Sequence, residues 1–163
     1  MASLDVESLF TNIPLEETIN ISCDSLFSNE AKINNFNRND FEKLFRMALQ
    51  NNFFNFDGKI YKQTDGVAMG SPLGPSLANA FLCFHEQIWL NDCPEDFKPV
   101  YYRRYVDDIF ALFRSPDHLE KFTNYLNSKH KNIKFTYEKE SNNSLPFLDI
   151  LISRSENGFK TSV

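Results

Sequence analysis

Two adjacent aspartates interrupt an apolar run, and this interruption constrains the fold more than any other feature of the 163-residue chain. Asp107 and Asp108 lie within residues 101–113, a stretch rich in aromatic and aliphatic residues that otherwise reads as a buried β-strand. Neighbouring carboxylates beside an apolar layer repel each other and lose hydration, and a divalent cation removes both penalties. The pattern predicts a hairpin turn that holds a metal ion, with an ordinary solvated turn as the alternative.

A third carboxylate, Asp5, lies in a strand-like segment near the start of the chain. Taken alone, an aspartate in a strand is typical of a sheet edge or a cap. Together with the aspartate pair, it predicts three acids at two strand ends, which is the pattern of a two-metal phosphoryl-transfer site. Mg²⁺ suits such a site because it binds a few carboxylates together with substrate phosphate oxygens.

Composition limits the class of protein. A 42% hydrophobic, 15% aromatic chain of this length predicts one domain with a substantial core. The formal charge of −5 does not favour nucleic-acid binding through bulk electrostatics. The three cysteines fit neither a disulfide framework nor a zinc pattern, which favours a reducing, intracellular compartment and leaves nucleus and cytoplasm open. No membrane segment is predicted.

Hydrophobic periodicity and turn residues predict an α+β fold, an antiparallel sheet packed on helices. The expected elements are a strand within 1–9, helices that begin at Pro14, at Asn39 and after Pro75, a hairpin over 52–63, the aspartate hairpin, a helix over 116–129, strands over 133–139 and 147–154, and a hairpin at Asn157-Gly158. Asn39 and Glu42 are the expected capping pair of the second helix. The expected buried faces are Phe41, Leu44, Phe45 and Ala48 in the second helix and Leu77, Phe81, Phe84 and Ile88 in the helix after Pro75.

The loop Gly66–Pro75 contains three glycines and two prolines. It is not a phosphate-binding loop, because it has neither the Gly-Lys-Ser/Thr ending of a Walker motif nor the Gly-x-Gly-x-x-Gly pattern. It is either a plain loop with Ser71 or Ser76 as a helix cap, or a small backbone surface that a base pair can approach. His85-Glu86 resembles the start of a zinc-protease helix, but Trp89 occupies the second histidine position, which excludes that class.

Several segments together resemble the palm of reverse transcriptases. The segments are 4–14, 66–75 and 105–108, and with 144–149 they are most similar to the Penelope-like retroelement branch. The resemblance covers essentially the whole chain, so that residues 1–163 are expected to form one reverse transcriptase domain. It implies a palm-type antiparallel sheet packed on helices and truncated at both ends, without the fingers and thumb of relatives.

The resemblance also implies an activity, the RNA-directed addition of deoxynucleotides to a primer 3′-OH. Asp5, Asp107 and Asp108, with the Val6 carbonyl, would hold two Mg²⁺ ions, with Mn²⁺ as a substitute. Lys139 is a candidate proton donor to pyrophosphate, although a solvated strand lysine is an equal alternative.

Further residues follow from the same resemblance as nucleotide contacts. Phe10 would exclude a ribose 2′-OH, with plain core packing as the alternative. Contacts to the incoming nucleotide and the templating base would come from Met69, Gly70, Ser71 and Pro72. The implied partners are an RNA or DNA template with its primer and dNTPs, without a membrane, and the oligomeric state is left open.

Two other functions are compatible with the sequence. The first is a catalytically inactive palm remnant that binds nucleic acid or a protein partner; the isolated chain is itself expected to be inactive without basic fingers. The second is an RNA-copying RNA polymerase, which the bulky Phe10 disfavours.

Overall fold

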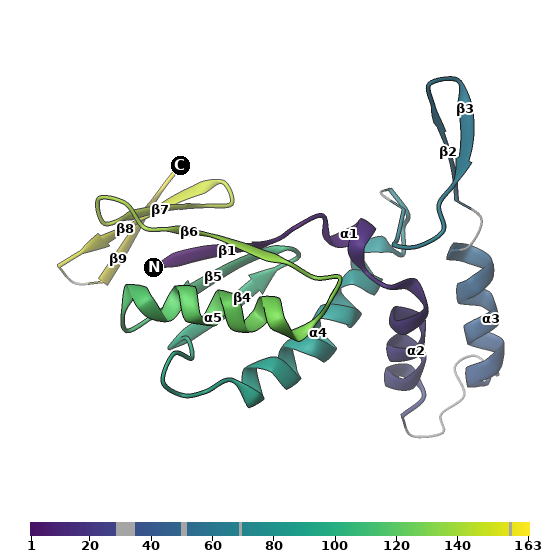
Figure 1. Ribbon diagram of the computed structural model, residues 1–163, viewed down its shortest axis with the longest axis horizontal. Helices are drawn as coiled ribbons and strands as arrows, with labels where there is room; N and C mark the ends of the chain where they lie inside the picture. Colours follow the sequence, from purple (N-terminus) through teal and green to yellow (C-terminus); the bar gives the residue numbers. More distant parts are fainter. Residues whose placement is uncertain (29–34, 50–51, 69, 157) are drawn as a thin grey trace. The chain divides into compact units, whose positions relative to one another are not determined.

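The structure, a computed structural model, describes residues 1–28, 35–49, 52–68, 70–156 and 158–163 (Figure 1). The chain forms two compact units, one made of residues 1–7 and 88–163 and the other of residues 8–87. Helix α4 (Gly74–Asp92) contributes residues to both units. The prediction of an α+β fold with antiparallel sheets is confirmed.

The first unit is built on a four-stranded antiparallel sheet in the order β4-β5-β1-β6 (Figure 1). Its strands are β1 (Ala2–Val6), β4 (Tyr101–Tyr105), β5 (Asp108–Leu112) and β6 (Phe135–Lys139). Alternation sets its two faces, since Ala2, Leu4 and Val6 are buried while Asp5 is exposed. Helix α5 (Pro116–Lys129) begins and ends as predicted, and its buried residues include Leu119, Phe122 and Leu126.

A second sheet in this unit corrects one prediction. The expected single strand over 147–154 is wrong, because the chain turns at Leu148 and Asp149 and forms two paired strands. The sheet consists of β7 (Ser144–Phe147), β8 (Ile150–Ser155) and β9 (Gly158–Ser162). The turn has no clear sequence signal, because apolar residues lie on both sides of it. Leu148 adopts a positive φ of 53° in this turn. Asn157 of the predicted last turn lies outside the described residues.

The second unit combines helices with a hairpin. Its elements besides α4 are α1 (Leu9–Asn12), α2 (Leu15–Leu26), α3 (Arg38–Leu49), β2 (Phe53–Phe56) and β3 (Lys59–Lys62). Its core joins Leu15, Ile19 and Cys23 of α2 to Leu49, Val67 and Leu77. The hairpin over 52–63 is confirmed, and both loop residues, Asp57 and Gly58, have the positive φ of a tight hairpin turn.

The predicted cap of α3 is wrong by two residues. The helix begins at Arg38, and the reciprocal capping pair is Asn37 and Asp40. The Asp40 amide donates to Asn37 Oδ1 at 3.0 Å, and the Asn37 amide donates to Asp40 Oδ2 at 3.5 Å. Three candidate caps, Asn37, Asn39 and Asp40, follow one another closely in this segment, so the side-chain pattern did not fix the first residue.

The predicted buried faces of two helices are partly wrong. In α3 the inward row is Phe41, Phe45 and Leu49, whereas Leu44 and Ala48 are exposed. In α4, Phe84 and Ile88 are exposed. The buried residues of α4 beyond Leu77 and Phe81 are Gly74, Ala78, Leu82, Glu86 and Trp89. Both helices have more apolar residues than one face holds, so periodicity alone did not select the buried row.

Within the residues that the structure describes, none of the helices combines the length and the apolar character that crossing a bilayer requires.

Candidate active site

The two strands β1 and β5 bring the predicted acids to one end of the sheet. Asp5 lies directly opposite Asp108 in the antiparallel register. Asp107 lies in the two-residue loop between β4 and β5, and its carbonyl oxygen accepts the Val6 amide at 3.2 Å. Residues that are opposite in an antiparallel pair have Cα atoms about 5 Å apart, so carboxylates distant in sequence become neighbours.

The loop that carries Asp107 is strained and anchored. Val106 has a φ of +55°, a conformation that β-branched residues rarely adopt and that costs on the order of 1–3 kcal/mol. The guanidinium of Arg104 donates from Nη1 to the Val106 carbonyl at 2.8 Å and so holds the loop in this conformation. Sequence reasoning missed Arg104, since a charged residue in a strand usually points to solvent.

Crowding of the acids changes their titration. Although the Asp5 side chain is exposed, partial loss of hydration raises the pKa of its carboxyl, and the charges of Asp107 and Asp108 raise it further. The pKa of Asp108 is also raised, first by burial and then by Asp107. Negative charge therefore accumulates at this end of the sheet.

The acids fit a hard divalent cation by their chemistry, because they supply only carboxylate oxygens that repel one another without it. The fit is not preformed: the described residues that place three ligand atoms within 4.8 Å of one another do not include these aspartates. Ion binding would have to draw the carboxylates closer.

The raised pKa of Asp5 predicts a pH-dependent gain of stability in Asp5→Asn. The pKa of the Asp5 carboxyl lies above its ordinary value of 3.8 in the folded state. Such a group binds more protons in the folded than in the unfolded chain, so the free energy of unfolding falls as the pH rises through its titration range. In a metal-free buffer, Asp5→Asn should therefore be more stable than wild type at neutral pH, with the difference shrinking toward about pH 4. Urea unfolding of both proteins across this range measures it, and a difference independent of pH would contradict an origin in the Asp5 charge.

A hollow of about 310 Å³ opens beside Asp5 and Asp108. Pro146, Phe147 and Leu148, from the end of β7 and its turn, also line it. The ring of Phe147 packs against Phe110 of β5, with centroids 5.6 Å apart, which fixes this wall to the sheet. The space beside the acids is thus bounded by two sheets of the same unit.

Lys139 is not brought to the acids. It pairs with Ala2 in the β1–β6 register, whereas Asp5 pairs with Thr136. Three residues of strand separate the two positions by about 10 Å, and the odd spacing places Lys139 on the opposite face of the sheet. The register gives the proposed proton donor no support.

In the second unit, Phe10 and part of the loop after Gly66 lie together. The Val67 amide donates to the Phe10 carbonyl at 2.7 Å, and Phe10, Gly70 and Ser71 line one hollow of about 350 Å³. Pro72 instead lines a larger hollow of about 750 Å³ that Ser71 and Gly70 share. Met69 lies outside the described residues.

Asp65 organises this loop, and sequence reasoning missed it. Its Oδ1 accepts the amides of Gly66 and of Leu15, both at 2.9 Å. Pro14, the N-cap of α2, has no side-chain acceptor for the helix amides, so an aspartate fifty residues away satisfies one of them. A cap from so distant a residue leaves no local sequence signal.

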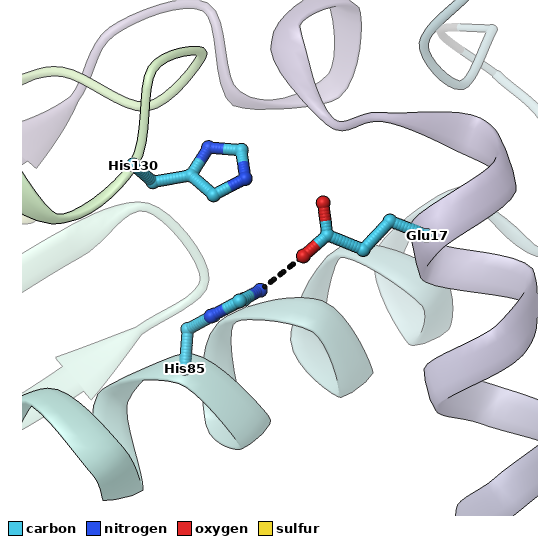
Figure 2. A group of neighbouring side chains, drawn as sticks. All are labelled: Glu17, His85 and His130. Carbon is cyan, nitrogen blue, oxygen red and sulfur yellow. Dashed lines mark hydrogen bonds and ion pairs between the residues drawn. The ribbon is translucent and has the colours of Figure 1, made fainter.

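His85 serves the packing of helices in the second unit. Its Nε2 and Glu17 Oε1 lie 2.9 Å apart and join α4 to α2 (Figure 2). Trp89, which takes the place of a second metal-binding histidine, is buried, and its ring meets Phe135 edge-on with centroids 6.2 Å apart.

Comparison with known proteins identifies the family to which the chain is similar. Residues 1–140 match the family model described as reverse transcriptase (RNA-dependent DNA polymerase). No curated protein matches the chain.

Two solved structures share the fold. A structure of apo telomerase from Candida tropicalis truncated from its C-terminal domain has a TM-score of 0.64 at 14% identity, and the match covers 99% of this chain and 35% of that one. A second apo telomerase structure from Candida tropicalis has a TM-score of 0.61 at 14% identity, covering 93% of this chain and 30% of that one. The chain thus spans about a third of the length of these proteins, and the likeness shows the fold alone.

Proposed function

Because this chain belongs to the reverse transcriptase (RNA-dependent DNA polymerase) family, we propose that it adds deoxynucleotides to a primer 3′-OH under the direction of a nucleic-acid template. One observation carries the proposal: Asp5 lies opposite Asp108 and beside the loop of Asp107, and Asp5 and Asp108 line a hollow of about 310 Å³. The substrates proposed are dNTPs and an RNA or DNA template with its primer.

The acids would hold a pair of Mg²⁺ ions, or Mn²⁺ in their place. Asp5, Asp107 and Asp108 would bind through their carboxylates, and the Val6 carbonyl is proposed as a further ligand. When bound, the ions would lower the pKa of the 3′-OH and would neutralise negative charge on the triphosphate and on the leaving pyrophosphate. The chain's own contribution is to fix two ligands on adjacent strands and the third on a loop that Arg104 anchors.

Phe10 is proposed to exclude ribonucleotides. Its ring is partly buried, and it approaches Gly74, where an added Cβ would lie 3.6 Å from the ring, so the ring is supported on one side. We predict that Phe10→Val admits ribonucleotides and lowers the preference for dNTPs roughly 10- to 100-fold, since a steric contact of this size is worth about 1–3 kcal/mol. Single-nucleotide incorporation with dATP and ATP measures the ratio, and an unchanged ratio would remove Phe10 from this role.

The finer assignments are also proposals. The retroelement origin and the Penelope-like branch depend on the resemblance of short sequence segments, and so does the view that residues 1–163 are one reverse transcriptase domain. Met69, Gly70, Ser71 and Pro72 are proposed as nucleotide contacts. Lys139 is left out of the proposed mechanism because its strand position faces away from the acids.

A second candidate function is a folded palm that binds nucleic acid or a protein without catalysis. One observation favours it for the chain by itself, the net charge of −5, which does not attract a nucleic-acid template through bulk electrostatics. Primer extension separates the two functions. The longest reading frame that contains these residues should give template-dependent products with Mg²⁺ and dNTPs, whereas duplex binding without any extension would favour the second candidate.

A further inference from the structure

The β2–β3 hairpin exposes aromatic side chains that its own unit does not cover. Phe54, Phe56 and Tyr61 are 52%, 68% and 43% exposed. A two-stranded hairpin is at best marginally stable in water by itself, and large apolar side chains exposed together are characteristic of binding surfaces. The hairpin therefore places three aromatic rings on a surface rather than in a core.

The strand register places these rings on one face. Phe54 pairs with Tyr61 and Phe56 pairs with Lys59, so all four side chains project from the same side of the hairpin. The rings of Phe54 and Tyr61 are stacked, with centroids 5.6 Å apart and planes 20° apart, and Phe56 meets Tyr61 edge-on at 6.5 Å. We call Phe54, Phe56, Lys59 and Tyr61 the aromatic face.

The charge of the hairpin is opposite to that of the chain. Residues 52–63 carry two lysines, Lys59 and Lys62, against the single aspartate Asp57, whereas the chain has a net charge of −5. Stacked or tilted rings beside lysines are the arrangement with which proteins bind single strands, because every base has a π-face and every nucleotide a phosphate. The local charge is therefore complementary to a polyanion although the chain as a whole is not.

The base of the hairpin continues into the loop proposed to contact the nucleotide. A hollow of about 750 Å³ is lined by Phe53 and Phe54 of β2 and by Gly70, Ser71 and Pro72 of that loop. All these residues belong to one unit. One groove thus connects the foot of the aromatic face to the loop.

We infer that the aromatic face binds single-stranded nucleic acid by base stacking, with Lys59 contacting its phosphates. The inference rests on the proposed function, because a template that is copied must reach the loop as an unpaired strand. Lys59 lies beside the rings and Lys62 on the opposite face of the hairpin, which favours a polyanion over an apolar protein surface. A protein partner is an outcome of the test.

The test measures binding of the whole chain to a fluorescein-labelled oligouridine RNA of about 12 nucleotides, within the size range of single-strand sites. The double variant Phe54→Val and Tyr61→Val keeps β-forming residues and removes the stacked pair. It should bind at least about tenfold more weakly, since each stacked base is worth on the order of 1–3 kcal/mol. Lys59→Gln should lower the slope of log affinity against log salt by about 0.7.

Two controls separate stacking from general damage. Phe159→Val removes a similarly exposed phenylalanine, 49% exposed, from β9 of the other unit and should leave RNA binding unchanged. Ile60→Val changes the opposite face of the same hairpin and should also bind as wild type. Far-UV circular dichroism and thermal unfolding check that each variant is folded, and if the double variant is not, Phe56→Val with Lys59→Gln takes its place.

The result overturns the inference if wild type does not bind the RNA, or if the aromatic variants bind it as wild type does. An unchanged RNA affinity together with a changed sedimentation coefficient would assign the face to a protein contact instead. Failure of the proposed function looks different: Asp107→Asn and wild type would then show equal nucleotide addition, whatever the hairpin binds.

Discussion

Replacing Gly66 by alanine is expected to lower the free energy of unfolding by about 3 kcal/mol or more. Gly66 has a φ of +74°, which costs an L-residue about 1–2 kcal/mol, and its added Cβ would lie 2.5 Å from the Thr11 carbonyl oxygen. The backbone cannot easily shift to relieve this clash, because the Gly66 amide donates to Asp65 and the Val67 amide donates to the Phe10 carbonyl. Overpacking of this kind adds about 1–3 kcal/mol.

Gly70→Ala is the matched control. Gly70 lies in the same loop and has a φ of +86°, but among the described residues no atom beyond its chain neighbours lies within 4 Å of its added Cβ. It should therefore show only the backbone cost of about 1–2 kcal/mol. Urea unfolding of both variants gives the difference, and equal destabilisation would mean that the close approach of Gly66 to Thr11 does not exist in solution.

The second large effect is expected on catalysis. Asp107→Asn should reduce primer extension by about a thousand-fold or more, since charge stabilisation by a bound metal is worth several kcal/mol and each 1.4 kcal/mol is about tenfold in rate. Folding should be preserved, because the Arg104 bond to the Val106 carbonyl, which holds the loop, does not involve the Asp107 carboxylate. Extension assays with an RNA template and saturating Mg²⁺ measure the loss.

Asp149→Asn supplies the control for this change. Asp149 is an exposed aspartate in another hairpin turn of the same unit, between β7 and β8. The same change of one oxygen to nitrogen there should leave extension within about twofold of wild type, as expected of a surface substitution. If both variants retained full activity, the acids would have no part in the reaction.

Sequence predicted those parts of the fold whose signals are local. The start of α5 and the 52–63 hairpin depend on signals within a few residues, Pro116 for the helix and the Asp57-Gly58 turn for the hairpin. The proximity of Asp5 to Asp108 was inferred from the cost of leaving acids beside apolar strands, and the register places the two opposite each other. Their catalytic role remains a proposal.

Other features depend on contacts that no local pattern contains. Asp65 caps α2 across fifty residues, and the burial of Leu49 rather than Leu44 in α3 is decided by what packs on that helix. Whether Lys139 lies near the acids depends on which residue of β6 pairs with Asp5. A change of register by one residue would move its side chain to the opposite face of the sheet. Tertiary contacts decide each of these features, and the local sequence favours none of the alternatives.

The most direct test is a Mg²⁺ titration of thermal unfolding in wild type and in Asp5→Asn. Wild type should melt at a lower temperature than Asp5→Asn without metal, because its acids repel one another, and should gain stability with saturation as the ion binds, by about 2.7 kcal/mol at a hundred times the dissociation constant. Asp5→Asn should gain much less. An equal, saturating gain in both proteins would show that residue 5 does not share a cation with Asp107 and Asp108.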